Sequence, residues 1–172
     1  MGSEMCIRDR LAVSPKFGLV HLTMTAGGMT KEKFSDLGVE VSALLLSEGH
    51  ITMVFDNAPS HRDLPRLLSD SHEYRHLPRY SPFFNMTEMA ISCVKSDCKR
   101  KLTEPSVQAD FGSHALAAAE GKTLHKYRMD LLKTFVEASL PCLTTAKCSN
   151  VFDHTLAFLP DCMSERDIGL SA

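Results

Sequence analysis

The first third of the chain alternates between strand-like and helix-like patterns of hydrophobic residues. Residues 17–25 alternate apolar and polar positions and then meet two glycines, which predicts a strand that ends in a turn. Thr30 can cap a following helix, whose apolar residues recur at helical spacing until Gly49 ends it. Residues 51–55 form a short, nearly continuous apolar run, which is typical of a strand buried on both faces.

The rest of the pattern predicts one more strand and several helices. In order along the chain, we expect a short helix over 63–68, a strand over 74–77, a helix over 85–102, a loop with a helical piece over 103–121, a helix over 124–136 and a helix over 150–159 that Pro160 stops. Strands alternate with helices first, and helices dominate afterwards. The expected fold is therefore α/β with a helical C-terminal extension.

The composition fits one globular domain and limits how the chain could hold nucleic acid. The 172 residues are 44% hydrophobic and 23% charged, with a formal net charge of −2. No apolar run approaches the roughly 20 residues that a membrane-spanning helix needs. A complete DNA-binding protein usually has a basic surplus, so contact with DNA would need a local basic patch or a domain that is absent here.

The cysteines give a prediction about redox state. There are six, irregularly spaced, in a sequence without an export signal, which favours reduced and mostly buried thiols. A zinc site built from Cys142, Cys148, His154 and Cys162 is the alternative, but the gaps between these residues match no common zinc pattern. We therefore expect free thiols.

The first ten residues differ in character from the rest. They show no hydrophobic periodicity, and they resemble a translated sequencing-library adapter in which a GTG codon was taken as the start. Leaders of this kind are excluded from fold reasoning. We expect residues 1–10 not to be native and the gene to continue upstream of Leu11, with a disordered native leader as the alternative.

Two acidic residues stand where α/β proteins hold catalytic groups. Asp56 follows the apolar run of residues 51–55, and the carboxyl ends of strands face ligand crevices in open α/β sheets. Pro78 and Pro82 fix an extended approach to a helix that has Glu88 in its first turn. We expect this approach to lie beside the strand that ends at Asp56, and two carboxylates suit a hard divalent cation. Taken alone, Asp56 would form an Asx turn and Glu88 would be a partner of the helix dipole.

Together the two segments resemble a family signature. Residues 56–61 read Asp-Asn-Ala-x-x-His, and residues 77–88 read Leu-Pro-x-Tyr-Ser-Pro-x-x-Asn-x-x-Glu. This pair is similar to the signature of transposases of the mariner-like superfamily and their bacterial insertion-sequence relatives. The two segments are specific as a pair, although either alone is weak, and a looser resemblance extends over 13–168.

The resemblance implies a DDE-type catalytic domain. Such a domain is an RNase H-like mixed sheet flanked by helices, in which three acids hold two Mg²⁺ or Mn²⁺ ions; Asp56 would be the second acid and Glu88 the third. Two such ions can activate a water or a 3′-hydroxyl and stabilise the leaving oxygen of a phosphodiester. Residues 11–102 would be the partial catalytic domain without its first strand, and residues 103–172 the helical extension.

Further residues receive expected roles from the resemblance and from their position. Lys95 lies two helical turns after Glu88 on the same face, and it resembles the DNA-contacting lysine of related integrases. The basic helix end that follows fits phosphate contact, with a solvated helix end as the equal alternative; its residues are Lys99, Arg100 and Lys101. Near the acids, we expect Asn57 in a supporting position, Asn85 as a helix cap and Tyr80 as a packing residue. His61 would be a supporting residue or a DNA contact, with a purely local bond as the equal alternative.

The sequence also departs from the family. Arg79 stands where a second proline is usual, and Met86 and Thr87 replace the usual Pro-Ile. No Asp or Glu between residues 11 and 28 fills the place of the first acid. Because the acids act as a unit, we expect a complete parent to cleave DNA and transfer strands at transposon ends, and this fragment to be inactive.

Two other functions stay open. A degenerate or domesticated remnant would bind DNA or a partner protein without catalysis. Another RNase H-like nuclease is disfavoured by the segment Tyr80-Ser81-Pro82. For the parent, the expected partners are DNA and a second copy of the chain, with no membrane. The expected location is the nucleus in a eukaryote and the cytoplasm otherwise.

Overall fold

Helices make up most of a mixed α/β structure. The computed structural model describes residues 7–26, 30–61, 72–79 and 81–164. The strands are β1 (Ile7–Ser14), β2 (Gly18–Ala26), β3 (Thr52–Phe55) and β4 (Glu73–His76). The helices are α1 (Lys31–Leu45), α2 (Met86–Leu102), α3 (Pro105–Gly112), α4 (His114–Ala119), α5 (Leu124–Ser139), α6 (Thr145–Leu156) and α7 (Leu159–Met163). Short 3₁₀ turns are η1 (Leu46–Glu48), η2 (Pro59–His61), η4 (Pro82–Phe84) and η5 (Leu140–Cys142).

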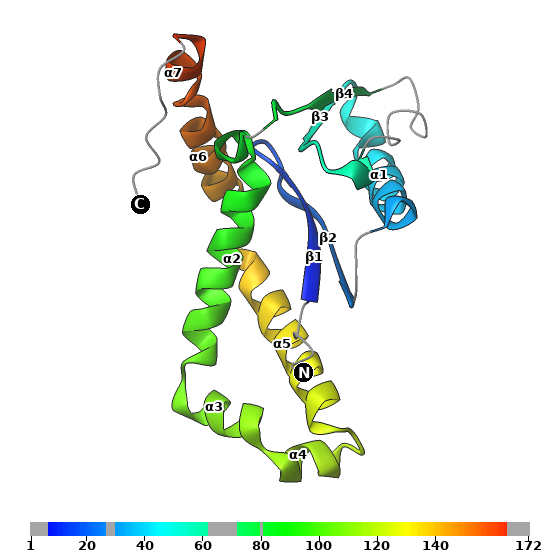
Figure 1. The fold of residues 1–172 in the computed structure, drawn as a ribbon, viewed down its shortest axis with the longest axis vertical. Helices are drawn as coiled ribbons and strands as arrows, with labels where there is room; N and C mark the ends of the chain where they lie inside the picture. The colour runs from blue at the N-terminus through cyan, green and yellow to red at the C-terminus, as the bar shows by residue number, and fades with distance from the viewer. Residues whose placement is uncertain (1–6, 27–29, 62–71, 80, 165–172) are drawn as a thin grey trace.

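The antiparallel hairpin of β1 and β2 forms a middle layer. It lies between α2 and α6 on one side and α1 on the other (Figure 1). Leu11 pairs with Leu22 in the ladder, and both join the core beneath α2. His21, the residue before Leu22, lies on the other side of the hairpin, where its Nε2 is 3.0 Å from the Glu40 carboxylate of α1. The alternation of residues 17–25 therefore predicted β2 correctly.

Residues 7–10, which the sequence pattern set apart as a leader, form the first half of β1. Ile7 lies opposite Ala26 and Asp9 opposite Met24 in the ladder. An antiparallel ladder is made by backbone groups, so it can include residues that show no hydrophobic alternation. The hairpin therefore begins before Leu11, where the expected catalytic domain was taken to start.

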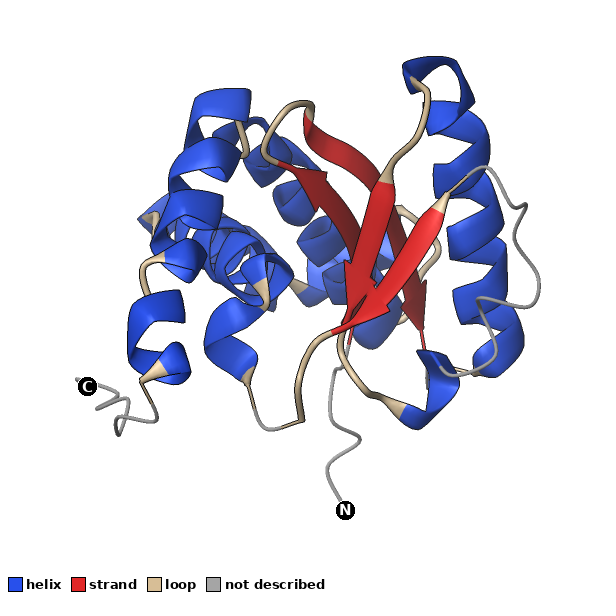
Figure 2. Ribbon diagram, turned by 90° about the horizontal axis from the view of Figure 1, so that it is seen from above, coloured by secondary structure: helices blue, strands red, loops and turns tan. Residues whose placement is uncertain are grey.

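The parallel strands β3 and β4 form a separate pair. The expected single mixed sheet is not present among the described strands: they make one antiparallel pair and one parallel pair. Figure 2 shows the strands in the middle of the molecule with helices on both sides. The prediction that β3 is buried on both faces is wrong, because Val54 is 55% exposed. Helix α1 covers the other face, where Phe55 meets the ring of Phe34 edge-on at 6.1 Å.

Helix α2 is the main packing element of the second half. Its buried residues Ala90, Val94 and Cys98 recur every four positions, which makes one apolar stripe along the helix. This stripe packs against β1, α5 and α6. The buried core cluster consists of Leu11, Ala90, Val94, Cys98, Val136, Leu143 and Cys148. The predicted helix over 85–102 is thus confirmed, with Asn85 as its N-cap accepting from the Thr87 amide at 3.1 Å.

The C-terminal helices match the pattern in part. Residues 103–121 contain two short helices, α3 and α4, where one helical piece was expected. Pro160 lies in the first turn of α7 and does not stop a helix, because proline is tolerated where the backbone N–H has no helical partner.

The helix predicted over 63–68 lies outside the described residues. None of the described helices is both long and apolar enough to cross a membrane.

Candidate functional site

A cleft of about 210 Å³ opens where β3, β4 and the start of α2 come together. Both acids that the sequence singled out, Asp56 and Glu88, line it. The full lining is Asp56, Asn57, Leu77, Pro78, Arg79, Ser81, Pro82, Asn85 and Glu88. Residues from both motif segments therefore share one cavity, although the segments are separated along the chain.

The parallel pairing of β3 and β4 places Asp56 at the cleft. Phe55 lies opposite His76 at the last pair of the ladder, so both strands end at the same edge. The Leu77 amide donates to the Phe55 carbonyl at 2.8 Å, and the Asn57 side-chain amide donates to the Leu77 carbonyl. These bonds hold the two segments side by side as they leave the sheet, at the edge where open α/β folds hold ligands.

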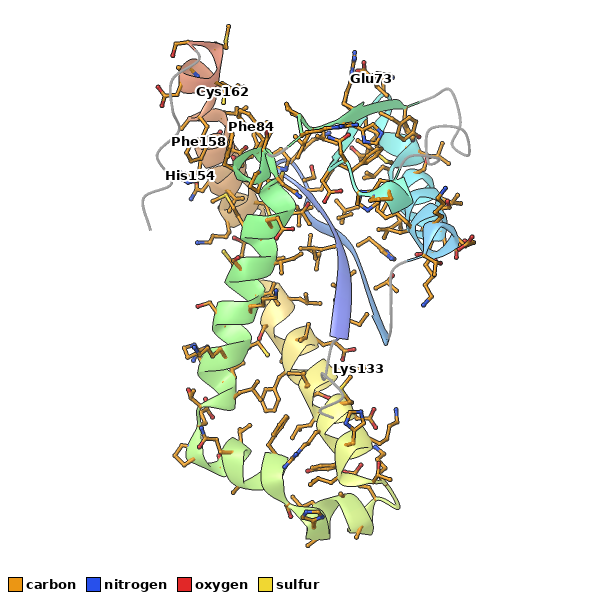
Figure 3. All side chains as sticks on the ribbon, in the orientation of Figure 1. Glu73, Phe84, Lys133, His154, Phe158 and Cys162 are labelled. Atoms are coloured by element: carbon orange, nitrogen blue, oxygen red, sulfur yellow. The ribbon has the colours of Figure 1, made fainter. Side chains whose placement is uncertain are left out.

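Glu88 reaches the cleft through a stiff turn. Residues Pro82–Phe84 form η4, and the Glu88 amide donates to the Asn85 carbonyl at 3.1 Å as α2 begins. The ring of Phe83 packs 5.4 Å from the ring of Phe158 in the turn after α6, which ties η4 to the helical side of the molecule. Figure 3 shows Phe84 and Phe158 near one another at this junction. Glu88 itself is exposed in the first turn of α2.

The Asp56 carboxylate is held from one side. His61 Nδ1 lies 2.6 Å from Oδ1, and the Ala58 backbone N–H donates to the same oxygen at 3.0 Å. His76 Nδ1 approaches the backbone carbonyl of Asp56 at 3.3 Å rather than its carboxylate. The bond of His61 is thus local, and its partner is the acid that the sequence singled out.

Arg79 also lines the cleft, and sequence reasoning treated it only as a departure from the motif. Its guanidinium makes no hydrogen bond or ion pair with any residue that the structure describes. The signal that could have found it is its position between Pro78 and Pro82, inside the approach to Glu88. Tyr80, expected to pack, lies outside the described residues.

The basic residues of α2 divide into two kinds. Lys95 and Lys99 are exposed, and their side chains make no hydrogen bond or ion pair with a described residue. Arg100 Nη2 and Lys101 Nζ each lie 2.7 Å from the Asp97 carboxylate.

Lys101 is also part of the packing between two helices. Its Nζ donates to the Ala138 carbonyl near the end of α5 at 2.6 Å. Hydrogen bonds from Lys101 and Arg100 hold the pKa of Asp97 well below its usual range. A structural role for Lys101 is thus visible, and DNA contact by Lys95, Lys99, Arg100 and Lys101 stays a prediction.

The donor set of the cleft suits one kind of metal. Among the described residues, no group of three or more His, Cys, Asp or Glu side chains could hold a metal ion, which applies to the alternative zinc set of Cys142, Cys148, His154 and Cys162 as well. The cleft offers two carboxylates, and Mg²⁺ is commonly bound by one or two carboxylates while it keeps several waters. Two carboxylates are donors of the kind that a hydrated Mg²⁺ or Mn²⁺ ion takes, and they do not form a closed all-protein site; binding of such an ion in this cleft stays a prediction.

Burial raises the pKa of the Cys148 thiol, whose side chain lies in the core, and likewise that of Cys142. The five cysteines in the described residues are free thiols. The expectation of free thiols is met for these five, but the expectation that most are buried is not, because only Cys98 and Cys148 are buried.

Comparison of the chain with protein-family models, with curated proteins and with solved structures finds no significant match. The assignment of a function therefore depends on the residues of the two motif segments and on the cleft that they share.

Proposed function

We propose that this chain carries the later part of a DDE-type transposase catalytic domain with an RNase H-like fold, in which Asp56 and Glu88 are the second and third metal-binding acids. The observation that carries the proposal is their presence in one cleft. A strand end and a helix start, far apart in sequence, deliver one carboxylate each. Convergence of this kind is what a shared divalent cation requires.

The arrangement of strands supports the RNase H-like part of the proposal. Each strand pair has two strands, so each of the four strands has one edge without a ladder partner among the described residues, and the proposal concerns the free edges of β1 and β3. A further strand that paired with both edges would join the four strands into one mixed sheet. That strand is where the first acid of a DDE site would stand.

Mg²⁺ or Mn²⁺ would be held in the cleft by the carboxylates of Asp56 and Glu88. Such ions supply Lewis-acid stabilisation of a phosphodiester and lower the pKa of bound water. In this chain, the two acids provide negative charge and oxygen donors, and the bonds around Asp56 keep its carboxylate in a fixed place.

Arg79 would contact the substrate in this cleft. Arg79 lines the cleft together with the two acids, and its guanidinium makes no hydrogen bond or ion pair with a described residue. Arginine binds phosphate oxygens with two parallel hydrogen bonds, so a DNA strand that enters the cleft offers it a partner. Arg79→Gln is expected to weaken binding of a short DNA duplex in the presence of Mn²⁺ and to reduce the salt slope by about one. Arg75→Gln is the matched control, because Arg75 pairs with Glu73 on β4.

Cation binding tests the proposal. Mn²⁺ titration followed by electron paramagnetic resonance should show a site in the wild-type chain that Asp56→Asn and Glu88→Gln each weaken by tenfold or more. Glu104→Gln is the control, since Glu104 is an exposed glutamate just beyond the other end of α2. Mn²⁺ binding that neither acid affects would refute the assignment.

Plasmid nicking separates a complete site from an incomplete one. The cleft contains two acids where a DDE site has three. We expect the purified chain not to nick supercoiled plasmid DNA with Mg²⁺. Strong nicking that Asp56→Asn abolishes would show that two acids suffice and that this expectation is wrong.

A non-catalytic remnant is the second candidate, and the two-acid lining favours it over an active nuclease. It differs from the parent enzyme in one measurable respect. A remnant that has lost its chemistry has no need of a cation site, so absence of Mn²⁺ binding together with retained DNA binding would favour it.

A further inference from the structure

His61 is enclosed by aromatic rings from two elements. Its imidazole stacks on Phe34 of α1, with ring centroids 3.6 Å apart and an interplanar angle of 20°. The ring of Phe55, at the end of β3, meets it edge-on at 6.3 Å. The His61 side chain is 13% exposed, in contrast to 47% for Asp56. The imidazole plane is therefore fixed by packing before any ligand binds.

The fixed ring directs Nδ1 at Asp56, where it also lies 3.4 Å from the backbone carbonyl oxygen. His61 Nδ1 lies 2.6 Å from Asp56 Oδ1, and a carboxylate oxygen can only accept, so Nδ1 carries the proton. Oδ1 also accepts from the Ala58 N–H. No described residue bonds to Oδ2, and Asp56 lines the cleft. One carboxylate oxygen is thus committed to the protein, and the other is left for a ligand.

We infer that Phe34 and His61 form a positioning pair that sets the orientation of the Asp56 carboxylate for a divalent cation. The inference rests on the proposed function, since it concerns the cation that Asp56 would bind. His61 is a positioning residue and not a ligand, because its Nδ1 donates to Asp56 and its ring lies against Phe34. Partners of this kind commonly change metal affinity by about 10–100-fold when they are removed.

A bond with a purely structural role would give the same geometry. The test therefore needs more than a loss of Mn²⁺ affinity when the His61 side chain is removed. His61→Ala should weaken Mn²⁺ binding about tenfold. His61→Asn places an amide N–H near the position of Nδ1 and should restore the affinity to within a few-fold of wild type. Phe34→Leu removes the stacking ring and should weaken binding in the wild-type background, but not in the His61→Ala background.

The matched control is His76→Ala. His76 bonds to the backbone carbonyl of Asp56 and not to its carboxylate, so its loss should leave Mn²⁺ affinity unchanged. Each variant is measured by Mn²⁺ electron paramagnetic resonance at one fixed pH, with its melting temperature recorded alongside. If His61→Ala does not fold, the comparison of His61→Asn with Phe34→Leu still decides the matter.

The outcomes separate this inference from the proposed function. Wild-type binding that depends on Asp56 and Glu88, with His61→Ala no weaker than His76→Ala, would overturn the inference and leave the proposed function standing. Failure of His61→Asn to restore affinity would also overturn it. Absence of any Asp56-dependent Mn²⁺ binding in the wild-type chain would instead remove the proposed function itself.

Discussion

The two acids of the cleft come from regions that are held together in different ways. Glu88 begins α2, whose apolar stripe is buried against β1, α5 and α6 in an aliphatic core. Asp56 ends β3, which has one face on α1 and the other open enough to leave Val54 half exposed. Around Asp56, ring contacts among Phe34, Phe55 and His61 provide much of the packing.

The difference separates stability from positioning. Burial of a large aliphatic surface stabilises the helical region. The position of Glu88 is set by this region, because α2 begins at a fixed cap. The strand region buries less, so the position of Asp56 depends on a few directed contacts. We therefore expect the helical region to determine whether the chain folds and the strand region to determine whether the cleft binds a ligand.

The largest expected effect is a difference in unfolding free energy between two variants, each with one carboxylate introduced into one of the two regions. Val94→Asp would bury an unpaired carboxylate in α2, where Val94 is 6% exposed, and should cost about 3–5 kcal/mol of unfolding free energy. Val54→Asp on the open face of β3 should cost less than about 1 kcal/mol. Urea denaturation of both variants checks this. Equal losses would mean that a partner covers β3 in solution.

Hydrogen exchange should show the same contrast without a mutation. Backbone amides of β3 and β4 are expected to exchange faster than those in the middle of α2 and α5, because local opening is easier where less apolar surface is buried. Mass spectrometry of peptides from the two regions measures it. Slower exchange in the parallel pair than in α2 would contradict the comparison.

A smaller, pH-dependent effect is expected at the junction of α2 and α5. The pKa of Asp97 is lowered in the folded chain, so its bonds to Lys101 and Arg100 add stability above the unfolded pKa of about 4. That stability is lost as the pH falls towards the pKa that Asp97 has in the folded chain. Solvent screening limits the size of this contribution. Asp97→Asn should lower the melting temperature at neutral pH. The difference in melting temperature between this variant and the wild type should become smaller below about pH 4. A gap that stays constant with pH would rule out this ion-pair contribution.

The smallest expected effect is a difference in melting temperature between variants of two nearby lysines in α2. Lys101→Ala removes the bond to the Ala138 carbonyl and should lower the melting temperature. Lys99→Ala should leave the melting temperature unchanged, because the Lys99 side chain is exposed and makes no hydrogen bond or ion pair with a described residue. Calorimetry of the two variants gives the answer. If the bond to Ala138 is not formed in solution, the two melting temperatures will be equal.

Local features of the fold could be predicted from the sequence, whereas features set by tertiary packing could not. The caps at Thr30 and Asn85, and the strand over residues 18–26, follow from local hydrogen bonding and alternation. The open face of β3 could not be predicted, because a continuous apolar run does not show whether a second layer is present. The pairing of residues 7–10 in β1 depends on backbone bonds that leave no hydrophobic pattern.

The residues around the candidate cleft were predictable in part: Asn57 and Asn85 were singled out with the two acids, whereas Arg79 and the packing of His61 were not. Asp56 and Glu88 could be singled out because their positions after a strand and at a helix start are local signals. The stacking of His61 on Phe34 joins residues from η2 and α1, which the sequence does not show to be neighbours. The partnership of Lys101 with Ala138 is likewise a tertiary contact, which the sequence of the basic helix end does not show.

The central claim is that Asp56 and Glu88 act on one cation in one cleft. A double-mutant cycle of Mn²⁺ affinity tests it most directly, with wild type, Asp56→Asn, Glu88→Gln and the double variant measured under the same conditions. If both carboxylates hold the same ion, either single change should remove most of the affinity, and the second change should add little. Losses that simply add, or a wild-type chain that binds no Mn²⁺, would contradict the account.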